Sequence, residues 1–449
     1  MIPDIALLEI FDSYVGEQQT EVWHRLVHVC RKWRNVVFGS PLRLGLRLLC
    51  TSSTPVRETL DVWPLLPIVI RVKGINIKVV DNILAALEHN DRIRELELFL
   101  VPNSQMEYVL AAMQQPFPTL TCLWLQPQLQ GETAPVVHAS FLGGSAPRLH
   151  ALRLYNISFL GLPKLLLSAT HLVDLDFGRI PHSGYISPEA IVTGLSMLTR
   201  LERLVIGFDS PRSCPDRKSR RSPPIRTLLP VLVKLLFKGV SEYLEDLVAR
   251  INAPLLDNLV ITFFHQLIFD TPQLAQFINR TPKFTAYDEA RVFFSCWHVS
   301  VKLPQTFEGT LELTILCKQA DWQLSSLAQV CSLSFLQALI PTLERLYIEL
   351  EFSRLYWQDD IESSQWLELF HPFTAVKDLH LSQELVTRIA PVLQEFVGER
   401  VTDVLPALQA LFLEEPIPSG PVREAIGQFV AARKLVSHSV QSVRGEFGY

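Results

Sequence analysis

Several motifs that commonly identify an enzyme are missing from this chain of 449 residues. There is no Gly-x-x-x-x-Gly-Lys-[Ser/Thr] phosphate loop, no Gly-x-Gly-x-x-Gly turn, no Gly-x-Ser-x-Gly elbow and no His-Glu-x-x-His pair. The twelve histidines are scattered without the spacing of metal ligands. We therefore expect no catalytic residues, no metal site and no cofactor.

Paired cysteines and long apolar runs are lacking as well. The seven cysteines form an odd set with no Cys-x-x-Cys pair, which is typical of reduced thiols. The chain begins with acidic residues, Asp4, Glu9 and Asp12, where an export signal would be basic. Its longest apolar stretch, 228–240, contains two lysines and is shorter than the ~20 residues that span a bilayer. We expect a soluble protein of the cytoplasm or nucleus with no membrane partner.

A general excess of positive charge is also absent, because 41 basic residues stand against 46 acidic ones, a net charge of −5. Nucleic acid is therefore an unlikely partner for the chain as a whole. Basic residues gather only at about 210–226, among prolines and serines, and we expect a disordered insertion there. A solvated loop is the favoured interpretation, with a nuclear-import or nucleic-acid patch as the alternative, and Ser222-Pro223 is a candidate phosphorylation site.

Leucine recurs in a regular pattern along most of the chain. The motif Leu-x-x-Leu-x-Leu, typical of the strand of a leucine-rich repeat, returns nine times with some replacements, and a weaker copy lies at 311–313. The first five middle leucines, at positions 96, 123, 152, 175 and 204, are 27, 29, 23 and 29 residues apart. Two larger gaps, 204–259 and 259–311, each predict a degenerate unit or an insertion, and 284–292 is the candidate strand of the second gap. Between the motifs, 80–88, 107–115, 188–197 and 324–339 have the spacing of short helices.

These patterns predict an α/β fold with four regions. Residues 1–45 form an all-α module, and 46–92 form a linker with the first solenoid or capping elements. Residues 93–420 form a degenerate leucine-rich-repeat solenoid, a curved parallel sheet with helices on its convex side. Residues 421–449 form a C-terminal cap and tail. Stacking is obligatory in such a fold because only its neighbours can cover the apolar face of each unit.

Two helical patterns occupy the first forty residues. The first runs from Pro3 to Tyr14, and the second places apolar residues at helical spacing from Leu26 to Val37. The second pattern is apolar nearly all round, which predicts burial on more than one side. A unit this small cannot supply that burial alone, so it needs a partner or the neighbouring domain.

The same residues resemble a known family. Pro3-Asp-x-x-Leu7-Leu-Glu-Ile-Phe11, followed by Leu26-Val-x-Val-Cys-Arg-Lys-Trp33 and Ser40-Pro41, is similar to an F-box motif, and the continuation resembles the large F-box-like families of basidiomycete fungi. The resemblance implies that the module docks the adaptor protein of a cullin-based ubiquitin ligase. It further implies that the following residues contact that adaptor or build the helices that do: Pro3, Leu8, Ile10, Phe11, Val29, Cys30 and Trp33. The alternative is a helical hairpin that caps the solenoid.

The repeat pattern also identifies a candidate binding face. Because strand side chains alternate, the residues beside the last two leucines of each motif share the face opposite the core. Acidic residues outnumber arginines on this face by eight to three, which predicts a net negative surface and a basic client segment. The candidate client-binding residues are Glu97, Trp124, Arg153, Tyr155, Asp176, Tyr347 and Glu349.

The leading hypothesis is therefore a non-catalytic substrate receptor of an SCF-type ubiquitin ligase. In this interpretation the N-terminal module binds the adaptor, and through it a cullin, while the solenoid binds an unknown protein client. The alternatives are an interaction scaffold outside any ligase and a nucleic-acid-associated protein that acts through the basic insertion.

Overall fold

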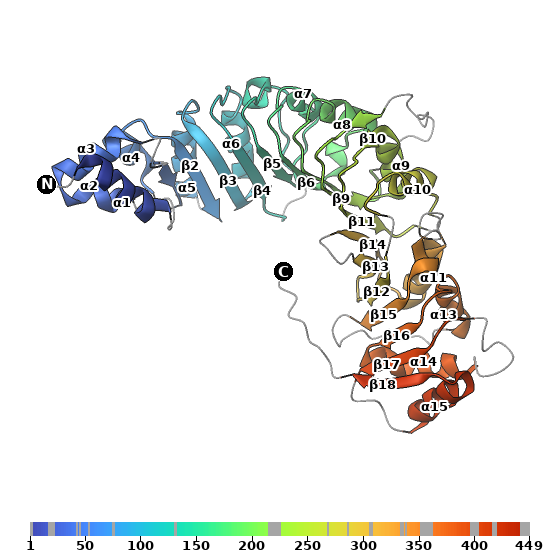
Figure 1. Ribbon diagram of the computed structural model, residues 1–449. Helices are drawn as coiled ribbons and strands as arrows, with labels where there is room; N and C mark the ends of the chain where they lie inside the picture. Colours follow the sequence, from blue (N-terminus) through green and yellow to red (C-terminus); the bar gives the residue numbers. More distant parts are fainter. Residues whose placement is uncertain are drawn as a thin grey trace. The chain divides into compact units, whose positions relative to one another are not determined.

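Two compact units, Met1–Asp209 and Ser210–Tyr449, make up the computed structural model of the chain (Figure 1). We call them unit 1 and unit 2 and describe each by itself. The structure describes residues 3–16, 23–41, 44, 46–52, 54–73, 77–129, 133–213, 226–266, 269–284, 287–304, 309–332, 336, 339–350, 362–395, 404–414 and 420–440.

Unit 1 begins with three helices, α1 (Asp4–Gly16), α2 (Trp23–Val29) and α3 (Arg31–Gly39). The sequence predicted a single second helix, which is wrong, because the chain breaks at Cys30. That residue is extended (φ −158°, ψ 167°), and its Sγ accepts a hydrogen bond from the backbone N–H of Trp33, which caps α3. We call residues 3–41 the N-terminal module.

The core of the N-terminal module extends into the residues that follow it. Trp23 is 1% exposed, and its Nε1 donates a 2.9 Å hydrogen bond to the carbonyl oxygen of Arg47. Its ring also meets the ring of Trp63 edge to face, with 5.3 Å between centroids. Leu48 and Leu66 belong to the same buried cluster. The neighbouring segment therefore supplies the burial that forty residues could not provide.

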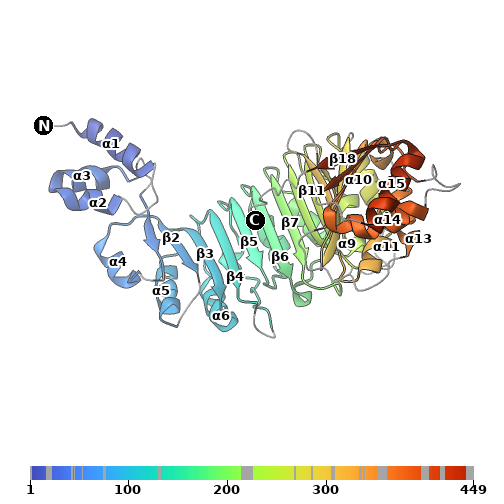
Figure 2. The same cartoon turned by 90° about the horizontal axis from the view of Figure 1, so that it is seen from below.

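A parallel sheet forms the rest of unit 1, with its strands in chain order (Figures 1 and 2). The strands are β1 (Leu48–Cys50), β2 (Ile68–Lys73), β3 (Ile93–Val101), β4 (Cys122–Pro127), β5 (Ala151–Tyr155), β6 (Asp174–Ile180) and β7 (Arg203–Phe208). The connections contain α4 (Val56–Val62), α5 (Ile77–Leu87), α6 (Asn103–Ala112), α7 (Leu162–Leu166) and α8 (Pro188–Leu195), with 3-10 turns at Phe141–Gly144 and His182–Gly184.

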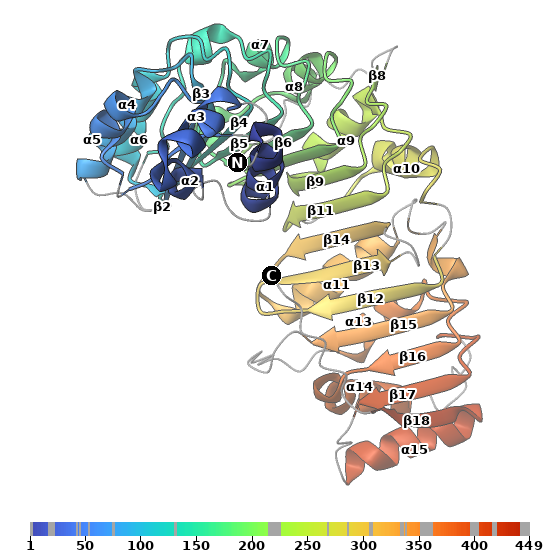
Figure 3. The same cartoon turned by 60° about the vertical axis from the view of Figure 1, so that its left-hand side comes forward.

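Unit 2 repeats this architecture with one interruption. Its main sheet has the order β9-β11-β14-β13-β12-β15-β16-β17-β18. The strands are β9 (Lys234–Gly239), β11 (Asn258–Phe264), β12 (Glu289–Phe294), β13 (His298–Pro304), β14 (Thr310–Leu316), β15 (Arg345–Leu350), β16 (Asp378–Leu381), β17 (Ala410–Glu414) and β18 (Val436–Val440). Among the described strands of this sheet, β13 alone runs antiparallel to both of its neighbours, and its arrow is reversed in Figure 3.

Helices and one small sheet complete the described part of unit 2. The helices are α9 (Ser241–Arg250), α10 (Pro272–Asn279), α11 (Ala320–Cys331), α13 (Ser363–Phe370), α14 (Gln383–Glu395) and α15 (Pro421–Arg433), with a 3-10 turn at Ile340–Thr342. Strands β8 (Thr227–Leu228) and β10 (Ile251–Asn252) pair with each other in parallel.

The leucine motifs coincide with strands of the structure. The second and third positions of all nine motifs, and the weaker pair Leu311 and Leu313, lie in β3–β7, β11 and β14–β17, and none of these side chains is more than 3% exposed. The fold is leucine-rich-repeat-like for this reason. Burying a leucine contributes about 1.5–3 kcal/mol relative to leaving it in water, so each repeat has a strong preference for this register.

Some strands were not identified from the leucine pattern. The hidden unit of the gap 204–259 is β9, whose Leu232, Leu235 and Phe237 fit the motif and are at most 2% exposed, so a copy visible in the sequence was missed. The predicted strand 284–292 is displaced to β12, Glu289–Phe294, which forms a hairpin with β13. The motif did not identify β1, β2, β13 or β18. In β2 the inward positions are Ile68, Ile70 and Val72, which keep the core apolar without any leucine.

The predicted disordered insertion lies mostly outside the described residues, which stop at 213 and resume at 226. Its described ends are held by the fold. Ser213 is 1% exposed, and Arg226 Nε donates a 3.2 Å hydrogen bond to the carbonyl oxygen of Ala249.

Replacing Trp23 by alanine is expected to destabilise unit 1 by about 3–5 kcal/mol, because the substitution leaves a cavity between the N-terminal module and Trp63. Denaturant unfolding followed by circular dichroism measures this loss. The matched control is Trp297→Ala, which removes a tryptophan that is 60% exposed and should change the free energy of unfolding by no more than about 0.5 kcal/mol. Equal effects of the two substitutions would show that the module does not share its core with the repeat.

Candidate functional site

The open face of each sheet is the side opposite the buried leucines. In unit 1, parallel register aligns one residue from each of six strands in a row. The row contains Arg71, Glu97, Trp124, Arg153, Asp176 and Val205. The four client-binding residues predicted at 97, 124, 153 and 176 are therefore direct neighbours across the strands.

Trp124 is at the centre of an aromatic and cationic cluster. Phe99 approaches its ring edge to face, with 4.4 Å between centroids, and the guanidinium of Arg153 lies 4.8 Å above its ring. Tyr155 is tilted against it at 6.3 Å. The buried Nε1 of Trp124 donates no hydrogen bond to any of the described residues. Trp124 is thus held mainly by ring contacts.

A network of carboxylates and guanidinium groups occupies the next strands. Arg203 bridges two aspartates, because its Nη1 donates to Asp174 Oδ1 at 2.7 Å and its Nη2 donates to Asp176 Oδ2 at 2.8 Å. The hydroxyl of Tyr155 donates to the same Oδ2 at 2.9 Å, and Arg153 Nε donates to Asp174 at 3.0 Å. Burial, with the neighbouring Asp176, raises the pKa of Tyr155 to about 12, so its phenol remains a neutral donor.

A glycine makes this arrangement possible. A Cβ atom at Gly178 would lie 2.3 Å from ring carbons of Tyr155, so only glycine leaves room for that ring beside β6. Asp176 is 1% exposed. It therefore holds the strands together and is not available to a client, which corrects its assignment as a client-binding residue.

The predicted negative charge of the open face is wrong for unit 1. Arg71 pairs with Glu95 at 2.9 Å and with Glu97 at 3.3 Å, and Arg47 pairs with Glu95 as well. Asp174 and Asp176 also pair with arginines. All four carboxylates on this part of the open face therefore have at least one arginine partner. The prediction failed because β2, which supplies Arg71, has no leucine signature.

Unit 2 carries a stack of rings on its open face. Tyr347, His380 and Phe412 occupy one row on β15, β16 and β17. Their centroids are 4.1 Å and 4.2 Å apart, with interplanar angles of 14° and 7°. The guanidinium of Arg291, on β12, lies 4.7 Å above the ring of Tyr347 and closes the end of the stack. Burial lowers the pKa of His380, so the imidazole is neutral near pH 7.

Glu349 lies next to this stack on β15. Burial, opposed by Arg291 and reinforced by Glu414 and Glu289, raises the pKa of its carboxyl group. No hydrogen bond to the side chain of Glu349 forms within the described part of the chain. On β15–β17 three carboxylates, those of Glu349, Asp378 and Glu414, stand against the single arginine Arg345. Negative charge is thus concentrated on this part of the open face.

The N-terminal module divides the predicted adaptor-binding residues into two groups. Pro3, Ile10, Val29 and Cys30 are exposed, Ile10 by 54% and Val29 by 59%. Leu8 and Trp33 are half-buried against the core. Phe11 is fully buried, with its ring 4.8 Å from that of Trp33, so it builds the module and cannot contact an adaptor directly.

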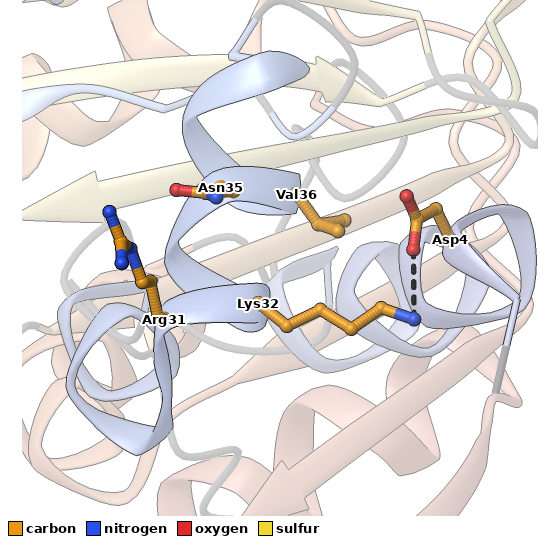
Figure 4. Close-up of a pocket in the computed structure, with 5 residues that line it drawn as sticks. All are labelled: Asp4, Arg31, Lys32, Asn35 and Val36. Atoms are coloured by element: carbon orange, nitrogen blue, oxygen red, sulfur yellow. Dashed lines mark ion pairs between the residues drawn. The ribbon is translucent and has the colours of Figure 1, made fainter. Parts of the chain in front are cut away.

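A shallow pocket lies where α1 meets α3 (Figure 4). It is lined by Asp4, Arg31, Lys32, Asn35 and Val36, and an ion pair of 3.1 Å joins Asp4 to Lys32. Asp4 and Lys32 are 66% and 39% exposed, so water screens the pair and its contribution to stability is small.

Comparisons with known proteins add little to the description of this chain. No family model matches the chain, and no curated protein matches it. Among solved structures, it is similar to the leucine-rich repeat-containing protein LegL7 from Legionella pneumophila, with 12% identity over 86% of this chain and 98% of that chain and a TM-score of 0.28. So distant a likeness carries no argument about function, and the fold assignment rests on the strands and buried leucines of this chain.

The described residues contain neither a membrane-spanning helix nor a cluster of metal ligands. None of the helices described in the structure is both long and apolar enough to cross a membrane. Among the same residues, no group of three histidine, cysteine or acidic side chains is arranged to hold a metal ion.

Replacing Arg203 by glutamine is expected to destabilise unit 1 by about 3 kcal/mol, because it leaves the buried Asp176 without its cationic partner. Urea denaturation measures the change. The control is Arg57→Gln in the same unit, which removes an ion pair to Glu88 whose two side chains are 70% and 62% exposed and should cost less than about 1 kcal/mol. If Arg203→Gln were equally mild, the network would not hold the sheet together.

Proposed function

We propose that this chain is a non-catalytic protein-binding subunit, and specifically the substrate receptor of a cullin-RING ubiquitin ligase of the SCF type. The N-terminal module would dock the adaptor, and the open face of the repeat would bind a protein client. The chain itself would make or break no bond. The observation that carries the binding role is the ring stack of unit 2 with Glu349 beside it.

The ring stack has the properties of an interface anchor. Tyr347, His380 and Phe412 are rigid and half-buried, so ordering them on binding costs little side-chain entropy. Aromatic residues account for much of the binding energy of protein interfaces. The carboxylates of β15–β17 add negative charge, which favours a client segment with an arginine or lysine. The basic client predicted from the sequence is therefore proposed for unit 2 and not for the neutralised face of unit 1.

Glu349 supports the proposal through its electrostatic cost. A carboxylate whose pKa is raised by burial destabilises the folded state at pH values above its ordinary pKa of 4.5. Glu349 thus lowers the stability of the folded chain, and it accepts no hydrogen bond from the described residues. A cationic group of a bound client would pair with this carboxylate and offset the cost. Binding residues often impose such a cost.

The adaptor role is supported by the exposed apolar side chains of the N-terminal module. Ile10 and Val29 are in contact with water over more than half of their surface although the module has a well-formed core. Together with the resemblance to an F-box motif, this favours a docked partner. A scaffold outside any ligase is the alternative, and co-purification with a cullin distinguishes the two. Nucleic-acid binding through the basic insertion at 210–226 would instead show steep salt dependence.

Changing Ile10 and Val29 together to glutamate is expected to abolish co-precipitation of the adaptor and cullin, because charged groups would enter an apolar interface. These two residues are a cleaner test than Leu8 and Trp33, which also support the core. Leu65→Glu is the matched control, since it charges an apolar residue that is 85% exposed and lies outside the module. Undiminished co-precipitation by a folded double variant would rule out the adaptor role.

Replacing Glu349 by glutamine is expected to weaken client binding and at the same time to raise the melting temperature at pH 7. The gain in stability should shrink as the pH falls and vanish below the ordinary pKa of 4.5, because the wild-type carboxyl group is then protonated in both the folded and the unfolded state. Clients are first identified by affinity purification and mass spectrometry, and binding is then titrated. This combination separates a lost contact from partial unfolding.

The companion variant is Phe412→Ala, which shortens the ring stack and should lower the affinity for the same client by roughly 10-fold or more. Thr262→Ala, on the open face of β11, is the control. If Glu349→Gln and Phe412→Ala both bound the client like the wild type, the open face of unit 2 would not be the client site.

A further inference from the structure

Two exposed tryptophans that the proposed function does not use lie near the carboxyl ends of β11 and β14. Trp297, 60% exposed, lies in the turn between β12 and β13, and Trp322, 48% exposed, lies in the first turn of α11. By contrast, Trp23 and Trp366 are each 1% exposed. Exposed tryptophans are costly in water, so a pair of them marks a candidate contact surface.

Hydrogen bonds place the two tryptophans close to each other. The backbone N–H of Cys317, just after β14, donates to the carbonyl oxygen of Trp297 at 2.9 Å. Gln323, next to Trp322, donates from its Nε2 to the carbonyl oxygens of Ser295 and Cys317, both at 2.8 Å. The turn, the end of β14 and the start of α11 are therefore tied together, beside β11 (Figure 3).

Each exposed ring of this locality has a nitrogen-bearing side chain against it. Lys318 Nζ lies 4.5 Å above Trp297, and the ring of His265 stacks on Trp322 at 4.9 Å and 12°. At the adjacent corner of the open face, Lys238 Nζ lies 5.7 Å above the ring of Phe264. We call these six residues the rim cluster: Lys238, Phe264, His265, Trp297, Lys318 and Trp322.

The rim cluster repeats one unit three times, an aromatic ring beside a basic side chain. Single-stranded nucleic acid repeats the complementary unit, a planar base beside a phosphate. Bases stack on aromatic side chains whatever their identity, and basic groups along the path contact the backbone. We propose that the rim cluster binds single-stranded nucleic acid, with bases stacked on Trp297 and Trp322 and phosphates at Lys318 and Lys238.

Other ligands fit the rim cluster less well. A methylated ammonium group would be repelled by the charge of Lys318, whose Nζ lies 4.5 Å from the centre of the Trp297 ring. Gln266, next to His265, donates a 2.8 Å hydrogen bond to the carboxylate of Glu242, whose negative charge opposes an anionic ligand at this end of the cluster. The net charge of −5 and the small number of lysines limit the affinity, so binding should be measurable at low salt and weaken as salt increases. This proposal does not depend on the proposed function.

The test is fluorescence anisotropy of a labelled twelve-nucleotide oligothymidylate with the full chain. Wild-type protein is expected to bind, and the double variant Trp297→Ala, Trp322→Ala should weaken binding by roughly 10-fold or more for each ring lost. Lys318→Gln should weaken binding and reduce the slope of log affinity against log salt by about 0.7. The thermal melts of the variants should match that of the wild type, because both tryptophans are exposed.

Tyr108→Ala is the matched control, since it removes an exposed aromatic residue on α6 in unit 1 and should leave the affinity unchanged. No binding by the wild type at low salt, or equal binding by the double variant, overturns the proposal. Binding to vesicles of phosphatidylserine, or to an acidic peptide, that matches or exceeds oligonucleotide binding and depends on the same two tryptophans also overturns it. Substitutions in the rim cluster should leave unchanged the binding of any client that depends on Glu349 and Phe412. This proposal and the proposed function can therefore fail separately.

Discussion

Parallel pairing of strands that are apolar on one side is the constraint on which the rest of this structure depends. Strands β3–β7, β9, β11 and β14–β17 turn leucine, isoleucine or phenylalanine inward, and that face is shielded from water only when neighbouring strands and connecting helices cover it. Because side chains alternate along a strand, shifting the register by one residue would expose the whole apolar set. The buried leucines therefore also decide which residues reach the open face.

The open face shows two ways of accommodating charge at a sheet surface. In unit 1, Arg71 and Arg203 each bridge two carboxylates, and this neutralises the surface and makes it part of the framework. In unit 2, rings stack across β15–β17 while Glu349 keeps a raised pKa. Satisfied polar networks rigidify a fold, whereas a group that costs stability needs another explanation. For this reason the client site is proposed on the open face of unit 2.

The N-terminal module depends on the repeat in the same way as the repeat units depend on one another. Trp23 contacts Trp63 and the backbone of Arg47, so the helices and the first strand share one core. Exposed apolar residues nevertheless remain on the module, including Ile10 and Val29. The shared core accounts for the apolar second helical pattern, and the remaining apolar surface is what the proposed adaptor would cover.

The sequence by itself determined the strands that carry leucine, since burial of Leu123 or Leu346 dominates the local energetics and its period is visible without a structure. It also determined the helical character of the module and the face on which Trp124 and Tyr347 lie. Tertiary structure alone decided where β2 and β13 lie, because isoleucine and valine fill most of their inward positions and break the leucine period. It alone decided that Asp176 is buried, that Arg71 neutralises Glu97 and that Tyr347 stacks on His380. Those outcomes depend on which strand lies next to which, and a pattern read along one chain contains no such pairing.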